Sequence, residues 1–382
     1  MKRSTNTLEI KKHNRNRVFR FVNSRNETCV SEVSLALNIS SPTVMTSIKE
    51  LKEAGIVEEV GEYESTGGRK AKAIASIKDA KYALGLDITQ NHVGIVYTDL
   101  RQKVLRYERI QKPFCNTESY LLELAEILKK FVAENHIPEE RIVGVGIAVP
   151  AIIDRKKNML THSRALEVFS VPCKEWTEKM PYPCELLNDA NAGAFCESVE
   201  SENQESMVYL SLSNTVGGAV VFHSDERNEY PGKMYEGNNW RSGEFGHMVI
   251  HPGGERCYCG KQGCLDAYCS AKKLADLENG KLELFFEKLE SGDKEYQKIW
   301  KTYLEDLAIA VDNLRMCFDC EVVLGGYVGY YMAPYIREFR NMVAEKNIFE
   351  DDGSYVRTCR YQKASLALGA AVYQIEKYID SI

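Results

Sequence analysis

One histidine and three cysteines close together in the sequence constrain the fold of this chain more than any other feature. The four residues are His247, Cys257, Cys259 and Cys264. Gly260 and Gly263 lie between the last two cysteines and let the chain double back tightly enough for the sulfurs to share one ion. One imidazole and three thiolates complete the tetrahedral shell of zinc and leave no position for a water molecule. We therefore expect a structural rather than a catalytic zinc.

A recognition element adjoins this predicted metal site. Glu244 lies three residues before His247, in the segment Gly243-Glu244-Phe245-Gly246-His247. A carboxylate so near a metal ligand indicates that the metal is tied to a binding site rather than to a separate module. A structural ion pair is the alternative role for Glu244.

The composition is that of a soluble globular protein with more than one domain. The 382 residues suffice for two or three domains, and 44% hydrophobic and 27% charged residues are ordinary values. No apolar run approaches the roughly 18 residues that a membrane span needs, and the polar start does not resemble a signal peptide. We expect a cytoplasmic protein with no membrane partner, whose 12 cysteines are thiols apart from one metal site.

Charge is distributed unevenly along the chain. Residues 1–80 hold 14 Lys and Arg against 10 Asp and Glu, whereas the remainder holds 35 against 45. Within the first 20 residues, seven side chains are basic and Glu9 is the only acid. A basic end on an acidic body predicts that one end of the chain contacts nucleic acid.

This basic end has the pattern of a helix-turn-helix. Apolar residues recur at helical spacing in three segments, from near Thr7 to Val22, from Val30 to Leu37 and from Ser41 to Leu51. Asn38 suits a left-handed turn before the third segment, and Gly55 suits the residue that follows its end. Two strands, over 56–60 and 72–75, flank a glycine turn and form a wing. Residues 1–78 are thus predicted to form a winged helix-turn-helix DNA-binding domain.

The third helix of this domain would enter the major groove. Its side chains expected to face outward and contact DNA are Ser41, Pro42, Thr43, Thr46 and Ser47. Arg69 and Lys70 at the tip of the wing suit a phosphate or the minor groove. A small helical domain that binds protein and not DNA is the alternative.

The rest of the chain predicts two related α/β lobes. Residues 82–195 give three strands, a helix, a strand and a helix, and residues 196–362, with the zinc site, repeat this order. The last helix, within 363–382, contains small residues and is expected to pack closely on the first lobe and complete it. Two such lobes around a cleft form the ribonuclease-H-like arrangement of actin and the sugar kinases. Asp87 and Asp189 would lie at the ends of strands, where such sheets bind ligands.

Taken together, these segments make the chain resemble the ROK family of repressors and sugar kinases along essentially its whole length. The motifs that carry the resemblance are Gly243-Glu244-x-Gly246-His247, Cys257-x-Cys259-Gly260-x-x-Gly263-Cys264-Leu265, Asn188-Asp189-x-Asn191, Leu324-Gly325-Gly326 and, in the wing, Gly67-Gly68-Arg69. The metal motif is highly specific for the family. The other motifs are individually weaker but occur in the right order.

The resemblance implies a set of sugar-binding residues. They are Asn188, Asp189, Glu244, His247 and the carboxylate after Cys-Leu, here Asp266. Where the family usually has Glu, Asp266 reaches about one methylene less, which puts its sugar contact in doubt. In family kinases the residue that matches Asp189 is the general base, a role that a carboxylate can fill by accepting the hydroxyl proton.

The segments that would hold ATP depart from the family kinases. Those kinases carry Asp-x-Gly-Gly-Thr after the first strand, where this chain has Asp87-Ile88-Thr89-Gln90-Asn91. Their second phosphate loop, Gly-Thr-Gly-x-Gly-Gly, reads Ser213-Asn214-Thr215-Val216-Gly217-Gly218 here. Because phosphoryl transfer depends on positioning the phosphates and neutralising their charge, we predict that this chain is not an enzyme.

The sequence therefore predicts a sugar-responsive transcriptional regulator that represses carbohydrate-metabolism genes. Its expected partners are an operator, bound by a homodimer or homotetramer, and a sugar or sugar phosphate in the cleft between the lobes. An ATP-dependent sugar kinase of the ROK family with an appended DNA-binding head is one alternative. A ligand-blind repressor controlled by a partner protein is another.

Overall fold

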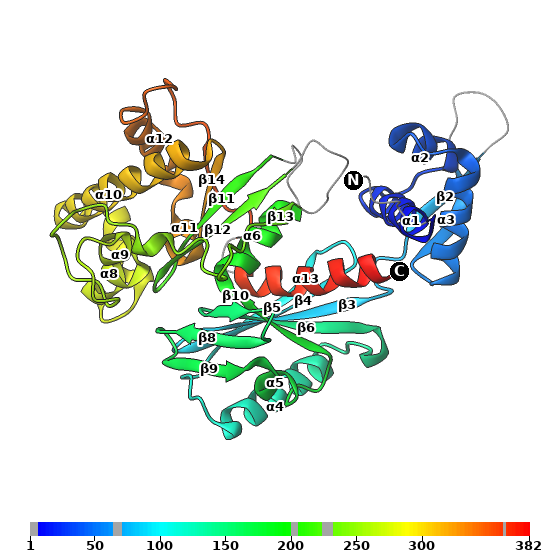
Figure 1. The fold of residues 1–382 in the computed structure, drawn as a ribbon, viewed down its shortest axis with the longest axis horizontal. Coiled ribbons are helices and arrows are strands. Elements are labelled where there is room, and N and C mark those ends of the chain that lie inside the picture. The colour runs from blue at the N-terminus through cyan, green and yellow to red at the C-terminus, as the bar shows by residue number, and fades with distance from the viewer. Residues whose placement is uncertain (1–6, 64–70, 200–204, 224–231, 362–363) are drawn as a thin grey trace.

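A small helical head is joined to a body of two α/β lobes, with the head at one end of the molecule and the second lobe at the other (Figure 1). The computed structural model describes residues 7–63, 71–199, 205–223, 232–361 and 364–382. Among these residues no helix is both long and apolar enough to cross a membrane. The winged helix-turn-helix followed by a two-lobed fold is the architecture that the sequence predicts.

The head contains three helices and a two-stranded antiparallel sheet. Its elements are α1 (Thr7–Asn23), α2 (Val30–Leu37), α3 (Ser41–Glu53), β1 (Val57–Tyr63) and β2 (Ala71–Ser76). Asn38 adopts the left-handed conformation between α2 and α3, with φ of 51°, as expected for a tight turn. Pro42 lies in the first turn of α3, where its missing N–H has no cost. Arg69 and Lys70 lie outside the described residues.

The first lobe is built on a mixed five-stranded sheet. Across the sheet the strands are β10 (Cys184–Asn188), β6 (Ile142–Val149), β3 (Tyr82–Ile88), β4 (His92–Asp99) and β5 (Val104–Gln111). Strands β3, β6 and β10 are parallel, and β4 is antiparallel to β3 and β5. Leu84 and Leu86 share a buried cluster with α4 (Glu118–Glu134), α5 (Cys173–Thr177) and the segment around η1 (Glu139–Arg141).

A second sheet of three short antiparallel strands extends the first lobe, and the sequence did not predict it. The strands are β7 (Ile152–Asp154), β8 (Met159–Ser163) and β9 (Val168–Pro172). Each has only three to five residues, and Asn158 and Glu167 at positive φ form the turns between them. Strands this short carry too few residues to display an alternating apolar pattern.

The second lobe, like the first, is built on a mixed five-stranded sheet. Its order is β13 (Lys233–Met234), β12 (Val216–Phe222), β11 (Met207–Leu212), β14 (Glu321–Gly325) and β15 (Val356–Thr358). The other elements are η2 (Phe245–His247), α7 (Leu265–Cys269), α8 (Ala271–Ala275), η3 (Asp276–Glu278), α9 (Leu282–Glu290), α10 (Lys294–Phe318), α11 (Gly326–Tyr331), η4 (Ala333–Tyr335) and α12 (Ile336–Ala344). Between η3 and α9, Asn279 and Gly280 adopt positive φ and interrupt the helical course of the chain.

Two helices cross between the lobes: α6 (Asp189–Val199) and α13 (Ser365–Ser381). Glycines allow α13 to approach its neighbours closely. A Cβ atom added to Gly85 of β3 or Gly146 of β6 would lie 1.9 or 2.1 Å from a carbonyl oxygen of α13. A Cβ added to Gly369 of α13 would lie 1.8 Å from the carbonyl oxygen of Ala192 in α6. The small residues of the last helix thus permit the close packing on the first lobe that the sequence predicts.

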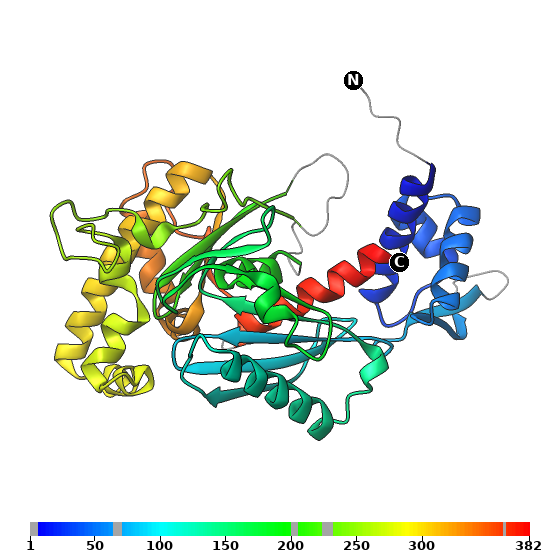
Figure 2. The ribbon, with the colours of Figure 1, turned by 60° about the horizontal axis from the view of Figure 1, so that its bottom comes forward.

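Helix α13 also reaches the head. In the two views it runs from between the lobes toward α1 (Figures 1 and 2). Val18 and Val22 of α1 belong to the same buried apolar cluster as Val372, Ile375 and Ile379 of α13. The head is therefore packed on the body through a shared core and is not joined to it by a linker alone.

The close approach at Gly146 predicts that Gly146→Ala lowers the free energy of unfolding by about 1–3 kcal/mol, because the added methyl group overlaps a backbone carbonyl that cannot rotate away. Gly94→Ala in β4 of the same sheet is the matched control, since its Cβ would meet only side-chain atoms, those of Tyr107 at 3.3 Å and of Asp87 at 3.6 Å. Urea unfolding of both variants measures the difference. Equal stability of the two variants would contradict this packing.

Candidate functional site

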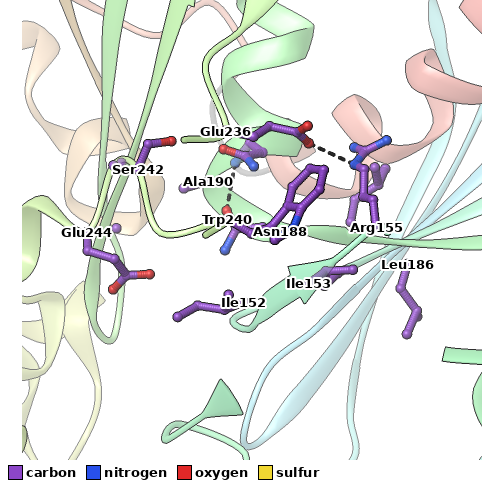
Figure 3. Close-up of a pocket in the computed structure, with 15 residues that line it drawn as sticks. Ile152, Ile153, Arg155, Leu186, Asn188, Ala190, Glu236, Trp240, Ser242 and Glu244 are labelled. Carbon is purple, nitrogen blue, oxygen red and sulfur yellow. Dashed lines mark hydrogen bonds and ion pairs between the residues drawn. The ribbon is translucent and has the colours of Figure 1, made fainter. Parts of the chain in front are cut away.

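A cavity of about 400 Å³ lies between the two lobes. It brings together four of the five residues that the resemblance assigns to a sugar: Asn188 and Asp189 from the first lobe, and Glu244 and His247 from the second. A smaller pocket shares Asn188 and Glu244 with it and extends toward Arg155 and Glu236. Figure 3 shows Glu244 and Ile152 among the residues that line this smaller pocket, and one of its dashed lines marks the 2.8 Å ion pair that Arg155 and Glu236 form across the lobes.

The end of β10 holds the first pair of polar side chains in place. The Asn188 amide donates to the Ala151 carbonyl at 3.1 Å and accepts from the Asn191 N–H at 2.9 Å, so its orientation is fixed. Asp189 begins α6, where its carboxylate accepts a 2.8 Å hydrogen bond from the Ala190 N–H. Burial raises the pKa of Asp189 to about 6. A carboxylate so placed can accept a hydrogen bond from a ligand hydroxyl.

Glu244 approaches from the second lobe, on the turn that leads into η2. Desolvation raises the pKa of its carboxyl group, and the nearby Asp189 raises it further, whereas Arg241 opposes the shift. Two carboxyl groups, one from each lobe, therefore face one space. Hydrogen-bond donors of a polyhydroxylated ligand would stabilise both in their ionised form.

Asp266 has a different position from the one expected, because it is not among the residues that line the cavity. Its buried carboxylate accepts a 2.6 Å hydrogen bond from the backbone N–H of Val216, a residue that does line it. Burial raises the pKa of Asp266 to about 6. The Asp266 side chain thus supports the wall of the cavity from behind.

The predicted metal ligands come together beside the cavity. One ligand atom from each of His247, Cys257, Cys259 and Cys264 lies within 4.8 Å of the others. The thiol of Cys257 faces Nδ1 of His247 at 3.8 Å, whereas Nε2 of the same ring lies 3.4 Å from the Tyr258 hydroxyl. The cluster could hold a metal ion on one side of the imidazole and leave the other nitrogen toward the cavity, which His247 also lines.

A further contact holds the cysteine-rich loop, residues 248–264, against α10 of the same lobe. Nε2 of His251 lies 2.7 Å from the Asp306 carboxylate on α10, and the His251 ring packs edge-on against Tyr268. The carbonyl of His251 lies so close to Gly263 that a Cβ there would be 1.7 Å away. Gly263 is therefore needed for the turn that carries Cys264.

The structure adds cavity residues that sequence reasoning missed. They are His162 and Arg164, in and directly after β8, with Arg241 and Tyr258 from the second lobe. Arg164 donates from Nη1 to the Tyr258 carbonyl at 3.1 Å, which joins the two lobes at the cavity. No periodic pattern marks charged residues in such loops, so only the spatial neighbours reveal them.

In the head, the exposed face of α3 differs from the predicted one. Ser41, Pro42 and Thr46 are exposed, as a DNA-facing role requires, whereas Thr43 is half-buried. The expectation that Ser47 faces outward is wrong, because its side chain is only 4% exposed. Ser47 lies three residues after Val44 and one before Ile48, and so falls on the buried stripe of the helix.

Two further residues complete the exposed face of α3. Met45 is 61% exposed, and Lys49 is exposed as well. Both follow at helical spacing from Pro42 and Thr46, so the helical period could have found them.

Another polar region lies near the end of β3, around the buried Asp87. Its pKa is raised to about 7, mainly by burial and also by the nearby Asp189, whereas Arg109 opposes the shift. Within the described part of the chain its Oδ1 atom has no hydrogen-bond partner. The Arg109 guanidinium lies 5.0 Å from the centre of the Tyr327 ring, so side chains of both lobes meet beside Asp87. Tyr107, Arg109 and Tyr327 also line a cavity of about 350 Å³ there.

Comparison with known families divides the chain as the fold does. Residues 83–377 match the ROK family, and residues 13–59 match the bacterial regulatory protein arsR family. The xylose repressor of Bacillus subtilis strain 168 is 26% identical over 274 residues, which cover 69% of this chain and 67% of that protein.

Solved structures agree with the fold. A ROK family transcriptional regulator described as a homologue of the Escherichia coli MLC protein superimposes with a TM-score of 0.75 at 18% identity, covering 97% of each chain. The ROK hexokinase from Thermus thermophilus superimposes with a TM-score of 0.59 at 25% identity, covering 78% of this chain and 99% of its own. The hexokinase match leaves part of this chain uncovered, whereas the regulator extends along nearly all of it.

The buried Asp87 predicts a pH-dependent gain in stability for Asp87→Asn. Because the folded pKa is raised from 3.8 to about 7, ionisation opposes folding, and the wild-type chain loses stability as pH rises from about 4 to 7. Asn does not titrate, so the variant should gain on the order of 2 kcal/mol relative to wild type between pH 4.5 and 8. Chemical unfolding at both pH values measures this. The exposed Asp79→Asn is the control, and an equal pH trend for both variants would contradict the expectation.

Proposed function

The chain belongs to the ROK family, and we propose that it is a sugar-responsive DNA-binding transcriptional regulator that represses carbohydrate-metabolism genes. The observation that supports this proposal best is that packed helices connect the interlobe cavity to the head. Helix α6, which begins with Asp189, packs against α13, and α13 shares an apolar core with the head. A ligand between the lobes can therefore influence the DNA-binding head. A repressor named for xylose among the relatives supports this class of effector.

The interlobe cavity would bind the sugar. Asn188, Asp189 and Glu244 supply amide and carboxylate oxygens that accept hydrogen bonds from hydroxyl groups. Nε2 of His247 lies on the side of the ring away from the Cys257 thiol and could contact the same ligand. Closure of the lobes around a sugar would bring both sets of side chains to it.

The head would bind DNA through α3, with Ser41, Pro42, Thr43, Thr46, Met45 and Lys49 toward the major groove. Arg69 and Lys70 remain candidates for the wing contact. A helix-turn-helix of this kind reads one half-site, so we infer a homodimer or homotetramer on a palindromic operator in the cytoplasm. The domain limits 1–78, 82–195 with 363–382, and 196–362 are part of the same proposal, and the sheet memberships support them.

The metal is proposed to be zinc with a structural role. Zinc–sulfur bonds of about 2.3 Å in a tetrahedron place two sulfurs about 3.8 Å apart. The Sγ atoms of Cys259 and Cys264 are 3.7 Å apart, which fits such a site. A zinc ion here would fix the His247 ring and the loop that carries Tyr258, and thus the shape of one cavity wall.

Catalysis is not part of the proposal. Asp87 lacks the glycines that follow it in family kinases, and Arg109 and Tyr327 occupy the space beside it from opposite lobes. Side chains in that space leave less room for the phosphates of ATP. The second candidate is nevertheless a ROK sugar kinase, because the ROK hexokinase shares the fold and Asp189 is present as a possible base.

Polar contacts reinforce the apolar junction between head and body. Arg20 of α1 forms a 2.5 Å ion pair with Glu376 of α13, and the Glu376 side chain is only 3% exposed. Gln102 of the first lobe donates to the same carboxylate at 2.6 Å. Asn23 donates to the Leu100 carbonyl at 2.8 Å. A displacement of α13 would therefore move α1, which packs against the DNA-facing α3.

The proposal predicts that a sugar releases the protein from its operator and that the cavity carboxylates are needed for this response. We expect Glu244→Ala and Asp189→Asn each to weaken sugar binding about 10- to 100-fold, because each removes charge-assisted hydrogen bonds, and to leave operator binding without sugar intact. The operator is selected from a random duplex pool, and the sugar from a thermal-shift screen. Release by sugar from the variants as from the wild type would contradict the site.

A coupled ATP-consumption assay over hexoses, aminosugars and xylose separates the two candidate functions. The proposal expects no turnover above that of heat-inactivated protein. Robust turnover that disappears in Asp189→Asn would establish the kinase instead. Operator binding that no sugar alters would support a repressor controlled by another protein.

Loss of a metal ligand should impair the cavity. Cys257→Ser is expected to lower the zinc measured by mass spectrometry well below one ion per chain and to weaken sugar binding about tenfold, because the His247 wall loses its anchor. Cys115→Ser, at an exposed thiol away from the cluster, is the control. Unchanged sugar affinity in the zinc-depleted variant would contradict this prediction and would limit the role of the metal to stabilising its own loop.

The junction predicts unequal effects at the two carboxylates that pair with Arg20. Glu376→Gln should reduce the ratio of operator affinities without and with sugar several-fold, because Arg20 of α1 loses the closer and buried one of its two carboxylate partners. Asp380→Asn should leave that ratio unchanged, since Asp380 is 63% exposed and 3.4 Å from the same arginine. Fluorescence anisotropy of labelled operator gives both ratios, and equal behaviour of the two variants would exclude a special role for the buried pair.

A further inference from the structure

The interlobe cavity carries positive charge that a neutral sugar does not require. Arg164 and Arg241 line it from opposite lobes, and His162 lies on the same wall as Arg164. We propose that the inducer is an acidic sugar, a sugar phosphate or a sugar acid, whose anionic group is bound by Arg164 and Arg241. This inference rests on the proposed function and specifies the chemical class of the ligand.

The position of Arg164 is fixed by the protein. Its Nη1 donates to the Tyr258 carbonyl at 3.1 Å, and its Nε donates to Nε2 of His162 at 3.2 Å. The His162 ring is itself packed edge-on against Phe169. A guanidinium group has five N–H donors, so those that remain on Arg164 are held ready for a ligand.

The two guanidinium groups have no anionic partner within ion-pair distance among the residues that the structure describes. By contrast, Arg155 at the neighbouring pocket pairs with Glu236, and Arg357 pairs with the buried Glu197. Both Arg164 and Arg241 lower the pKa of His162, after the larger effect of its burial, so their charges act on the same region. Glu244 is the carboxylate whose pKa Arg241 influences, and it is also a proposed ligand of sugar hydroxyls.

The side chains of the cavity fall into two groups that bind different parts of a ligand. Asn188, Asp189 and Glu244 provide acceptors for hydroxyl groups. Arginine can only donate, and its planar fork matches the paired oxygens of a carboxylate or phosphate. A ligand that satisfies all of these groups has hydroxyls and an anionic group in one molecule.

Calorimetric titration of the full chain with matched sugars tests the inference. Each pentose, hexose or N-acetylhexosamine is compared with its phosphate and, where it exists, its uronic acid, and inorganic phosphate is titrated separately. We expect an acidic member to bind at least tenfold more tightly than its neutral parent, and its affinity to fall as salt rises. Whether the phosphate or the uronic acid is preferred tells the two sources of negative charge apart.

Arg241→Gln should remove most of this preference and leave the affinity for the neutral parent within about twofold. Arg164→Gln also loses the contact with the Tyr258 carbonyl, so it should weaken binding of the neutral parent as well, but binding of the acidic member at least severalfold more. Arg256→Gln, in the same cysteine-rich loop but not in the cavity lining, is the matched control and should change neither affinity. Melting temperatures verify that each variant is folded.

The outcomes separate this inference from the function on which it rests. Tighter binding of a neutral sugar than of its acidic counterparts, with release of the operator, overturns the acidic ligand and retains the sugar-responsive regulator. Equal loss of acidic and neutral binding in the arginine variants also overturns it. Binding of inorganic phosphate alone, or of no sugar at all, overturns both proposals.

Discussion

The close packing of α13 is the contact on which the rest of the structure depends. Its backbone lies against Gly85 and Gly146 of the first-lobe sheet, and Gly369 lets it touch α6, because none of these positions has room for a Cβ atom. The helix that begins with Asp189 is thereby held between the lobes. The same α13 continues to the head, where its apolar residues and Glu376 meet α1. Helix α13 therefore contacts both α6, which carries Asp189 of the cavity, and α1, which packs against the DNA-facing α3. A movement of α6 or of α1 must therefore either move α13 or be resisted by it.

The cavity itself is assembled from groups that are costly to place together. Desolvation raises the pKa of Asp189 and of Glu244, the nearby Asp189 raises the pKa of Glu244 further, and the cysteine-rich loop approaches both from the second lobe. Such a site is more stable with a ligand that supplies donors to the carboxylates. Interlobe contacts of Arg155 with Glu236 and of Arg164 with Tyr258 already join the walls. Differential stabilisation of one lobe arrangement is what an inducer must provide.

The sequence predicted the parts of this arrangement that have a local physical signature. Strands such as 82–88 and 142–149 are continuous buried apolar runs, and the His247–Cys264 spacing has the chemistry of a metal shell. It missed β7–β9, which are too short for a pattern, and with them the wall that carries His162 and Arg164. The spacing rule that placed Val44 and Ile48 inside should have placed Ser47 there too. By contrast, the bond from Val216 to Asp266 joins residues far apart in the chain, and only the folded structure reveals it.

The central claim is that the interlobe cavity and the DNA-binding head are energetically coupled. Calorimetric titration of the inducing sugar into free protein and into the protein–operator complex tests it most directly, because coupling between two ligands is reciprocal. The account predicts that operator DNA weakens sugar binding by the same factor by which sugar weakens operator binding. An identical sugar affinity in the two states would contradict it.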